Sequence, residues 1–236
     1  MSVRAITFDF WCTLFQDAHG HRRQRLRVEA LARTAGVSQA AAQEVLDAAY
    51  REFFRVHIEE QRTLAPMDAV RMSCDALQVE IGADATRKLS QCFGRAILDY
   101  APEPVADALA AVRAAAARVP VGLVSDSGMS PGSSLRALLQ RHGFTEHLAV
   151  LTFSDELGVA KPQAPMFETA ARALGVAPAE LLHIGDLEPT DVKGIQRLGG
   201  TAALFGGVNP RYVGQTEAEH TFVTWREFID VLPRLL

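Results

Sequence analysis

Chemically reactive side chains occur where short apolar runs of this sequence end. Each run is followed by polar residues or glycine, which is typical of a buried strand entering a loop. The reactive residues at these ends are Asp9, Ser125, Asp126, Lys161, Asp186 and Asp191. A carboxylate in such a place can be a nucleophile, or an oxygen ligand for a hard cation such as Mg²⁺.

The order of the elements predicts that these residues meet. After residue 118, the apolar runs VPVGLVSDSG, LAVLTFSDE, LLHIGDLE and TAALFGG alternate with helical patterns. This alternation favours an α/β fold, a Rossmann-like parallel sheet flanked by helices, with a helix expected over 104–118. Ligands of open α/β sheets bind beyond the carboxyl ends of the strands, which gathers the reactive residues at one edge.

The stretch 18–100 differs, because four helical patterns follow one another there without a strand-like run. Ser38 and Asp84 are expected N-caps, and Pro66 suits a first helical turn. One apolar face is expected from Leu89, Phe93, Ile97 and Tyr100. We therefore predict a core domain over 1–17 and 101–236, with an inserted α-helical cap domain over 18–100.

Composition narrows the classes of partner. The net charge of -4 provides no basic field, so nucleic acid and anionic membrane surfaces are not expected partners. Cys12, Cys74 and Cys92 form no CxxC pair, which suits a reducing compartment, and no signal peptide or spanning segment is evident. We expect a cytoplasmic protein, monomeric or homodimeric, that acts on a small molecule.

The polar clusters together resemble the motifs of the haloacid dehalogenase-like (HAD) superfamily, in its members with a helical cap after the first motif. DFWCT is similar to the first motif, VSDSG to the second, the lysine of VAKPQAPMFE to the third, and HIGDLEPTDVKGIQRLGG to the fourth. The four occur in the family's order and span essentially the whole chain.

This resemblance implies phosphoryl transfer through an aspartyl-phosphate on Asp9, with Mg²⁺ as cofactor. The implied metal ligands are Asp9, the backbone carbonyl of Trp11, Asp186 and Asp191. Ser125 and the backbone N–H groups around Asp126 and Ser127 would bind the phosphoryl oxygens. Lys161 would neutralise charge between nucleophile and phosphate, and Thr13 would orient Asp9 or its loop.

Trp11 departs from the pattern of the family's phosphatases, which usually carry an acid-base aspartate there. An indole N–H has no usable acidity near neutral pH, and losing positioned proton transfer typically costs about 10²- to 10⁴-fold in rate. Metal-free 2-haloacid dehalogenases of the family carry an aromatic residue at this position, but they lack the metal-binding aspartate that Asp186 matches. A non-catalytic HAD-fold binding protein is a third reading.

Other residues near the site have secondary roles in this interpretation. Arg22 and Arg23 begin an arginine-rich helix and are candidates for binding a second anionic group, although charge runs on helices usually face water. Trp11 could stack on a flat part of the substrate. Cys12 is expected to be inert, and His183 to be a buried, hydrogen-bonded strand residue. The prediction is a Mg²⁺-dependent hydrolase of a small phosphorylated molecule with altered acid-base catalysis.

Overall fold

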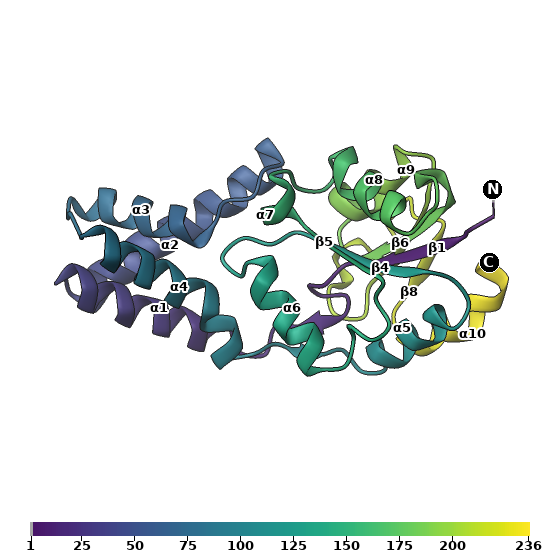
Figure 1. Ribbon diagram of the computed structural model, residues 1–236, viewed down its shortest axis with the longest axis horizontal. Helices are drawn as coiled ribbons and strands as arrows, with labels where there is room; N and C mark the ends of the chain where they lie inside the picture. The colour runs from purple at the N-terminus through teal and green to yellow at the C-terminus, as the bar shows by residue number, and fades with distance from the viewer. Residues whose placement is uncertain (1) are drawn as a thin grey trace.

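The computed structural model describes residues 2–236, and the body of the protein is a six-stranded parallel sheet in the order β5-β4-β1-β6-β7-β8 (Figure 1). The strands are β1 (Ala5–Phe8), β4 (Val121–Ser125), β5 (Val150–Phe153), β6 (Leu181–Gly185), β7 (Thr201–Phe205) and β8 (His220–Phe222). The predicted Rossmann-like α/β fold is confirmed. Strand β8 was not predicted, because its three residues include only one buried apolar side chain, Phe222.

Helices cover both faces of the sheet. They are α5 (Ala108–Ala116), α6 (Gly132–Arg141), α7 (Ser154–Leu157), α8 (Ala164–Ala173), α9 (Lys193–Gln196) and α10 (Trp225–Leu235), with short turns at η2 (Pro178–Glu180), η3 (Glu188–Val192) and η4 (Pro210–Tyr212). In Figure 1, α8 and α9 lie above the sheet, and α5 and α10 lie below it. The helix expected over 104–118 is shorter, because Asp107 has a left-handed φ of 62° that a helix excludes.

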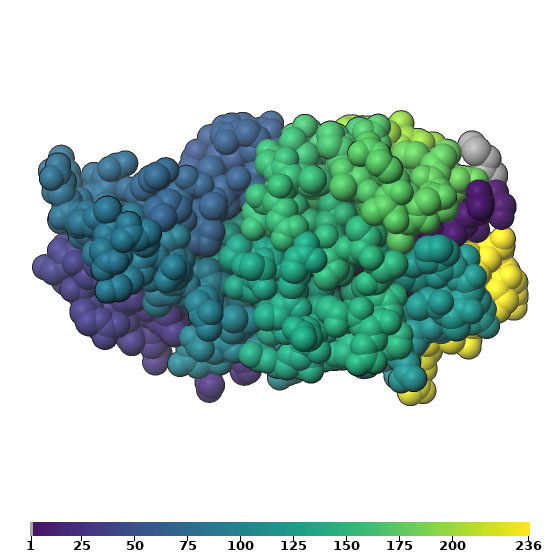
Figure 2. Space-filling model, in the orientation of Figure 1, coloured from purple at the N-terminus to yellow at the C-terminus, as the bar shows by residue number. Residues whose placement is uncertain are grey.

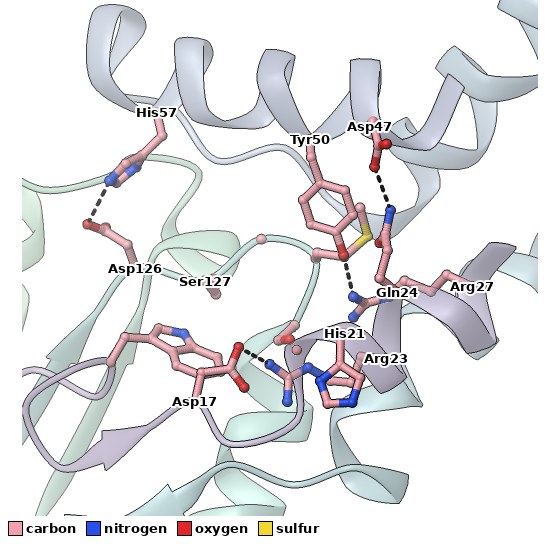
Figure 3. Close-up of a pocket in the computed structure, with 15 residues that line it drawn as sticks. Asp17, His21, Arg23, Gln24, Arg27, Asp47, Tyr50, His57, Asp126 and Ser127 are labelled. Atoms are coloured by element: carbon pink, nitrogen blue, oxygen red, sulfur yellow. Dashed lines mark hydrogen bonds and ion pairs between the residues drawn. The ribbon is translucent and has the colours of Figure 1, made fainter. Parts of the chain in front are cut away.

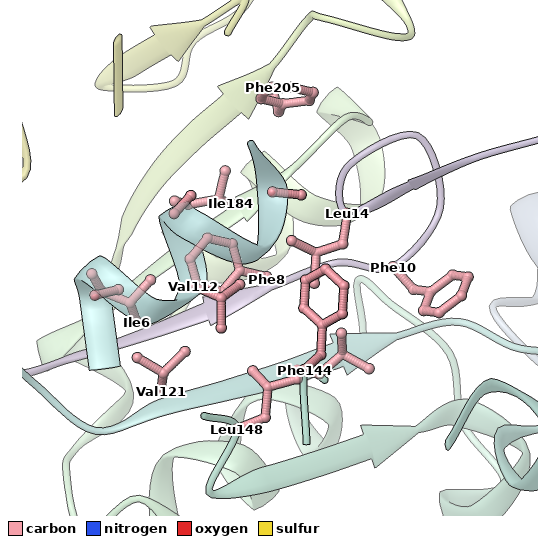
Figure 4. Close-up of a cluster of buried hydrophobic side chains, with 14 of the residues drawn as sticks. Ile6, Phe8, Phe10, Leu14, Val112, Val121, Phe144, Leu148, Ile184 and Phe205 are labelled. Carbon is pink, nitrogen blue, oxygen red and sulfur yellow. The ribbon is translucent and has the colours of Figure 1, made fainter. Parts of the chain in front are cut away.

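Strand β1 shows how alternation divides the core between these faces. Ile6 and Phe8 point into an aromatic cluster with Phe144 and Phe205 (Figure 4), whereas Ala5 points to the cluster around Phe167. Successive side chains of a strand face opposite ways, so β1 at the centre of the sheet is buried on both sides. Its end is consequently held rigidly, and Asp9 directly follows it.

Residues 20–99 form a helical lobe beside the body. Its elements are α1 (Gly20–Ala35), α2 (Gln39–Arg55), the π-helical turn η1 (Val56–Glu60), α3 (Pro66–Leu77) and α4 (Ala83–Asp99). Ser38 caps α2 by accepting a bond from the Ala41 N–H, and Pro66 begins α3, as predicted. The expected Asp84 cap is wrong: Gly82 precedes α4, and Asp84 lies in its first turn, where it pairs with Lys88.

The lobe has its own core, and the chain enters and leaves it through one ribbon. Leu31, Leu46, Val70 and Phe93 are fully buried within it. The chain enters through β2 (Phe15–Gln16) and returns through β3 (Glu103–Pro104), which pair with each other as a two-stranded antiparallel ribbon. Figure 2 shows the lobe in purple to blue at one end of an elongated molecule and the body in green at the other. Within residues 2–236, no helix has both the length and the apolar character needed to cross a membrane.

Candidate active site

The carboxyl ends of the central strands bring the predicted residues together. Strand β1 pairs with β4 on one side and with β6 on the other. The Asp9 N–H continues the ladder by donating to the Ile184 carbonyl at 2.8 Å. Asp9 therefore lies between Asp126, which follows β4, and Asp186, which follows β6. The reactive side chains therefore meet at the carboxyl-terminal edge of the sheet, where the sequence predicted them.

Lys161 is the cation at the centre of this group. Its Nζ donates to Asp9 Oδ1 at 2.7 Å and to Asp191 Oδ1 at 2.5 Å, and all three side chains are buried. Burial by itself would lower the Lys161 pKa, but the carboxylates of Asp191, Asp9 and Asp126 together raise it above its ordinary value. Lys161 is consequently a fixed positive charge beside the proposed nucleophile.

Asp191 is held by three donors. Besides Lys161, the His183 ring lies 3.1 Å from Oδ1, and the Leu187 N–H donates to Oδ2 at 2.9 Å. Burial favours the neutral acid, but Lys161 and His183 outweigh it and hold the Asp191 pKa below its ordinary range. Gly185 permits this position, because a Cβ there would overlap Cβ and Cγ of Asp191.

His183 is a buried strand residue, as expected. Burial lowers the pKa of its ring, which is therefore neutral. Because a carboxylate only accepts hydrogen bonds, Nε2 carries the proton and donates to Asp191, and Nδ1 accepts from the Thr7 hydroxyl at 2.9 Å. His183 thus orients Asp191.

Among residues 2–236, Asp186 has no cationic partner. Its Oδ2 accepts a 2.7 Å bond from the amide of Asn209, which follows β7. Burial, followed by the nearby carboxylates of Asp191 and Asp9, raises the Asp186 pKa to about 7. Asn209 was missed from the sequence, although the strand-end rule applied to TAALFGG also points to the segment that contains it.

The charges of this group fit a divalent cation. Asp9, Asp186 and Asp191 supply three buried carboxylates against the single ammonium of Lys161. Within residues 2–236, Asp9 Oδ2 and Asp186 Oδ1 have no hydrogen-bond partner, whereas both Asp191 oxygens are engaged. No three Asp, Glu, His or Cys side chains of that part of the chain converge closely enough to form a metal site alone. Mg²⁺ is usually held by one or two carboxylates with water and substrate phosphate, so Asp9 and Asp186 suit it.

The loop after β4 differs from expectation at Ser127. Its backbone N–H, expected to face a phosphoryl group, instead donates to Ser154 Oγ at 2.8 Å, and its hydroxyl donates to Asp155 at 2.5 Å. Ser125 is buried and donates to the Asp126 carbonyl at 3.2 Å. The Lys161 N–H donates to Asp126 Oδ1 at 2.9 Å, and burial is the main reason why the Asp126 pKa is raised, to about 6.

The turn after Asp9 contains Trp11, Cys12 and Thr13. Trp11 packs edge-on against Phe10, with ring centroids 5.1 Å apart. Burial raises the pKa of Cys12 to about 12, with the Asp186 and Asp9 carboxylates contributing, which leaves an inert thiol as expected. Thr13 is buried, its hydroxyl has no partner among the described residues, and its carbonyl accepts a 3.2 Å bond from the Trp225 indole. Trp225 thereby holds the turn.

A cavity of about 640 Å³ lies between the lobe and the body (Figure 3). Its lining combines Trp11, Asp126 and Ser127 of the body with residues of α1, α2 and η1. Arg23 lines it, pairs with Asp17 at 2.6 Å and is 5.9 Å from the Trp11 ring. Arg22 is exposed and does not line this cavity.

Comparison with known proteins agrees with this geometry. The family model described as haloacid dehalogenase-like hydrolase matches residues 3–199. The chain belongs to the haloacid dehalogenase-like hydrolase family. A phosphoserine phosphatase of Thermus thermophilus is 30% identical over 187 residues, which cover 78% of this chain and 73% of that protein.

Solved structures of the same fold include members with different chemistry. A HAD phosphatase from Thermococcus onnurineus has a TM-score of 0.70 at 18% identity, covering 98% of both chains. A 2-haloacid dehalogenase from Pseudomonas syringae has a TM-score of 0.72 at 18% identity, covering 99% of this chain and 100% of its own. At this identity the likeness establishes only the fold of this HAD-like hydrolase. Its reaction has to be inferred from the residues of the site.

Proposed function

We propose that this HAD-like hydrolase is a Mg²⁺-dependent phosphatase of a small phosphorylated metabolite, with Asp9 as nucleophile. The observation that carries the proposal is the buried cluster of three carboxylates around one lysine, in which Asp186 has no cationic partner. Such an excess of negative charge in a poorly hydrated site is costly unless a cation or a proton balances it. The relationship to a phosphoserine phosphatase supports the same reaction class.

The side chains divide the work of a two-step displacement. An oxygen of Asp9 forms a bond to phosphorus while the ester bond breaks, and water then hydrolyses the aspartyl-phosphate. Lys161 holds Asp9 in place and offsets charge on the phosphoryl oxygens. The Ser125 hydroxyl, which donates to the Asp126 carbonyl in the free protein, would turn to donate to a phosphoryl oxygen. Bound Mg²⁺ would neutralise charge on the transferring group, with Asp9, Asp186 and the Trp11 carbonyl as its protein ligands and Asp191 fixing the surroundings.

The metal-free dehalogenase reaction is the competing function. Trp11 favours it, because an aromatic side chain stands where the family's phosphatases usually carry an acid. Asp186 weighs against it, because its carboxyl group is buried beside the carboxylates of Asp191 and Asp9 and becomes an uncompensated charge above its pKa of about 7. We therefore favour phosphate esters.

The helical lobe would act as a cap over this site. The cavity between lobe and body is where a substrate can meet residues of both, and the single β2–β3 connection allows the lobe to move as a unit. The three cysteines are free, which is consistent with the proposed cytoplasmic setting.

Phosphate release from p-nitrophenyl phosphate tests this function, because its leaving group needs little help from an acid. The assay is run with Mg²⁺, with EDTA, and with Asp9→Asn in place of the native chain. We expect turnover that requires Mg²⁺ and is lost in the variant. Turnover that persists undiminished in Asp9→Asn would refute the nucleophile. Halide release from a 2-haloacid in EDTA, without phosphatase activity, would replace the proposal by the dehalogenase reaction.

A further inference from the structure

Arg27 is a buried cation without a counter-ion, and it lines the cavity between the lobe and the body. Only 3% of its surface is exposed. Its Nε donates to the Phe93 carbonyl at 3.0 Å and its Nη1 donates to the Tyr50 hydroxyl. Among the described residues, Nη2 has no partner and no carboxylate forms an ion pair with Arg27. A buried guanidinium in this state favours an anion at its free N–H.

Tyr50 adds a second donor beside Nη2. Its oxygen accepts from Arg27, so the phenolic proton is free to point elsewhere, and burial raises the Tyr50 pKa, which keeps that proton in place. Figure 3 shows the Tyr50 hydroxyl and the Arg27 guanidinium meeting at the wall of the cavity. Two adjacent donors, one of them charged, match the two oxygens of a carboxylate.

The neighbouring residues offer acceptors instead. Gln24 Oε1 is buried without a partner, and the Gln24 amide donates to Asp47 at 3.1 Å, which fixes the orientation of the side chain. Asp47 also accepts a 2.7 Å bond from Gln43. Acceptors beside the donors of Arg27 and Tyr50 suit a ligand that carries a hydroxyl or ammonium group next to its carboxylate. They disfavour a ligand with a second phosphate dianion.

We propose that Arg27 and Tyr50 form a subsite for a carboxylate on the leaving-group half of the substrate. This inference rests on the proposed phosphatase function and names its substrate class: phosphate esters of small hydroxy or amino acids. The cavity is lined by Arg27 in the lobe and by Trp11 and Asp126 in the body, and these two body residues follow β1 and β4, the strands whose ends adjoin Asp9.

The test compares two esters that differ by a carboxylate alone, O-phosphoserine and O-phosphoethanolamine. The native protein should hydrolyse the first with a kcat/KM roughly 10- to 100-fold higher, the range of one or two charge-assisted hydrogen bonds. Arg27→Met should remove this preference. Tyr50→Phe, which retains the ring, should reduce it. Arg25→Met, on the exposed side of α1, is the matched control.

An equal preference in native protein and Arg27→Met would overturn the subsite while leaving the phosphatase intact. If the native protein hydrolyses no phosphate ester, the proposed function has failed, and the subsite is then judged by binding. O-phosphoserine should raise the unfolding temperature of native protein more than O-phosphoethanolamine does, and Arg27→Met should abolish the difference. The same response in both proteins would refute the subsite.

A different observation carries a second inference, about the proton that Trp11 cannot supply. His57 lies in η1 at the end of α2 and lines the cavity, and its Nε2 is 3.7 Å from Asp126 Oδ2 (Figure 3). That separation is too long for a direct hydrogen bond, so Nε2 is available to a ligand. Asp126 is itself fixed by the Lys161 N–H. The helical lobe thus holds an imidazole over the end of β4.

We infer that His57 is the proton donor and acceptor of the reaction. As an Asp9 oxygen bonds to phosphorus and the ester bond breaks, His57 in its imidazolium form gives its Nε2 proton to the departing oxygen. Burial lowers the pKa of the His57 ring in the free protein, so the negative charge of the bound ester is what favours the imidazolium. Neutral His57 then takes a proton from water, whose oxygen bonds to phosphorus as the bond to Asp9 breaks. Phosphate and free Asp9 are restored, and His57 is protonated again. A proton donor from the lobe would make catalysis depend on its closure.

Single-turnover rates with two leaving groups test this role. His57→Asn should slow cleavage of an alkyl phosphate by roughly 10²-fold or more and change the release of p-nitrophenol little. Adding Trp11→Asp to His57→Asn should recover alkyl phosphate cleavage. His147→Asn, before β5 at the opposite edge of the sheet, is the control. An equal loss for both substrates, without recovery by Trp11→Asp, would show that His57 only latches the lobe to the body.

Discussion

The ammonium nitrogen of Lys161 lies 2.7 Å from Oδ1 of Asp9, between two strand ends that are 152 residues apart in sequence. The same nitrogen reaches Asp191, so one cation holds both carboxylates in a buried site. The proposed nucleophile is therefore positioned before any substrate binds.

Replacing Lys161 by Met should destabilise the metal-free protein by about 3–5 kcal/mol, because two buried carboxylates lose their partner. Activity should fall as well, since charge on the phosphoryl group is no longer offset. Urea unfolding in EDTA measures the stability. Lys193→Met, at the start of α9, should cost much less, because the Lys193 side chain is 40% exposed and pairs with Glu217 at the surface. Similar losses in both variants would contradict the role given to Lys161.

Gly185→Ala should displace Asp191 and disconnect it from Lys161, because the added methyl group overlaps the aspartate side chain. We expect turnover to fall at least as far as it does in Asp191→Asn. Gly82→Ala provides the comparison, since nothing lies within 4 Å of a Cβ at that position. Unchanged activity in Gly185→Ala would mean that the position of Asp191 is unimportant.

Asp186 makes the stability of the metal-free protein depend on pH. Its pKa of about 7 in the folded state exceeds the ordinary value of 3.8, so above pH 4 the folded state retains a proton that the unfolded chain releases. The free energy of unfolding should thus fall as pH rises toward 7, by at most ~1.4 kcal/mol per pH unit from this group. Thermal unfolding in EDTA from pH 5 to 8 should show the decline. Asp186→Asn should flatten it, and Mg²⁺ should stabilise the native protein most at the upper end.

Trp11→Asp should raise hydrolysis of alkyl phosphates relative to aryl phosphates, because an acid near the leaving group matters most for poor leaving groups. The ratio of the two kcat/KM values is the measurement. If His57 already supplies the proton, the gain in the native background will be small and the gain in His57→Asn large. No change in either background would mean that proton transfer does not limit this enzyme.

Much of the fold could be predicted because each strand and helix is encoded locally. The period of apolar residues predicted the sheet and the helices of the lobe, and the strand-end rule gathered Asp9, Lys161 and Asp186. The short strand β8 was missed, because three residues carry little pattern. The predicted Asp84 cap was wrong, because Gly82 ends the preceding loop two residues earlier.

The parts of the site that come from the lobe could not be predicted in the same way. The run HRRQRLR contains arginines on both sides of α1, and the packing of the lobe decides that Arg23 and Arg27 turn inward while Arg22 and Arg25 remain exposed. His57 reaches Asp126 from η1, a π-helical turn with no marker in the sequence. Ser127 donates its N–H to Ser154, a partner 27 residues away.

The ribbon that joins lobe and body has a consequence for how this protein can change. Gln16 and Glu103 face each other in β2 and β3, so the chain enters and leaves the lobe at adjacent points. Arg27, Tyr50 and His57 all lie in this lobe, whereas the carboxylates and Lys161 lie in the body. Under the proposed function, substrate choice and phosphoryl chemistry are therefore encoded in separate segments of the gene. Exchanging the segment between residues 16 and 103 would change the substrate preference and leave Asp9 unaltered.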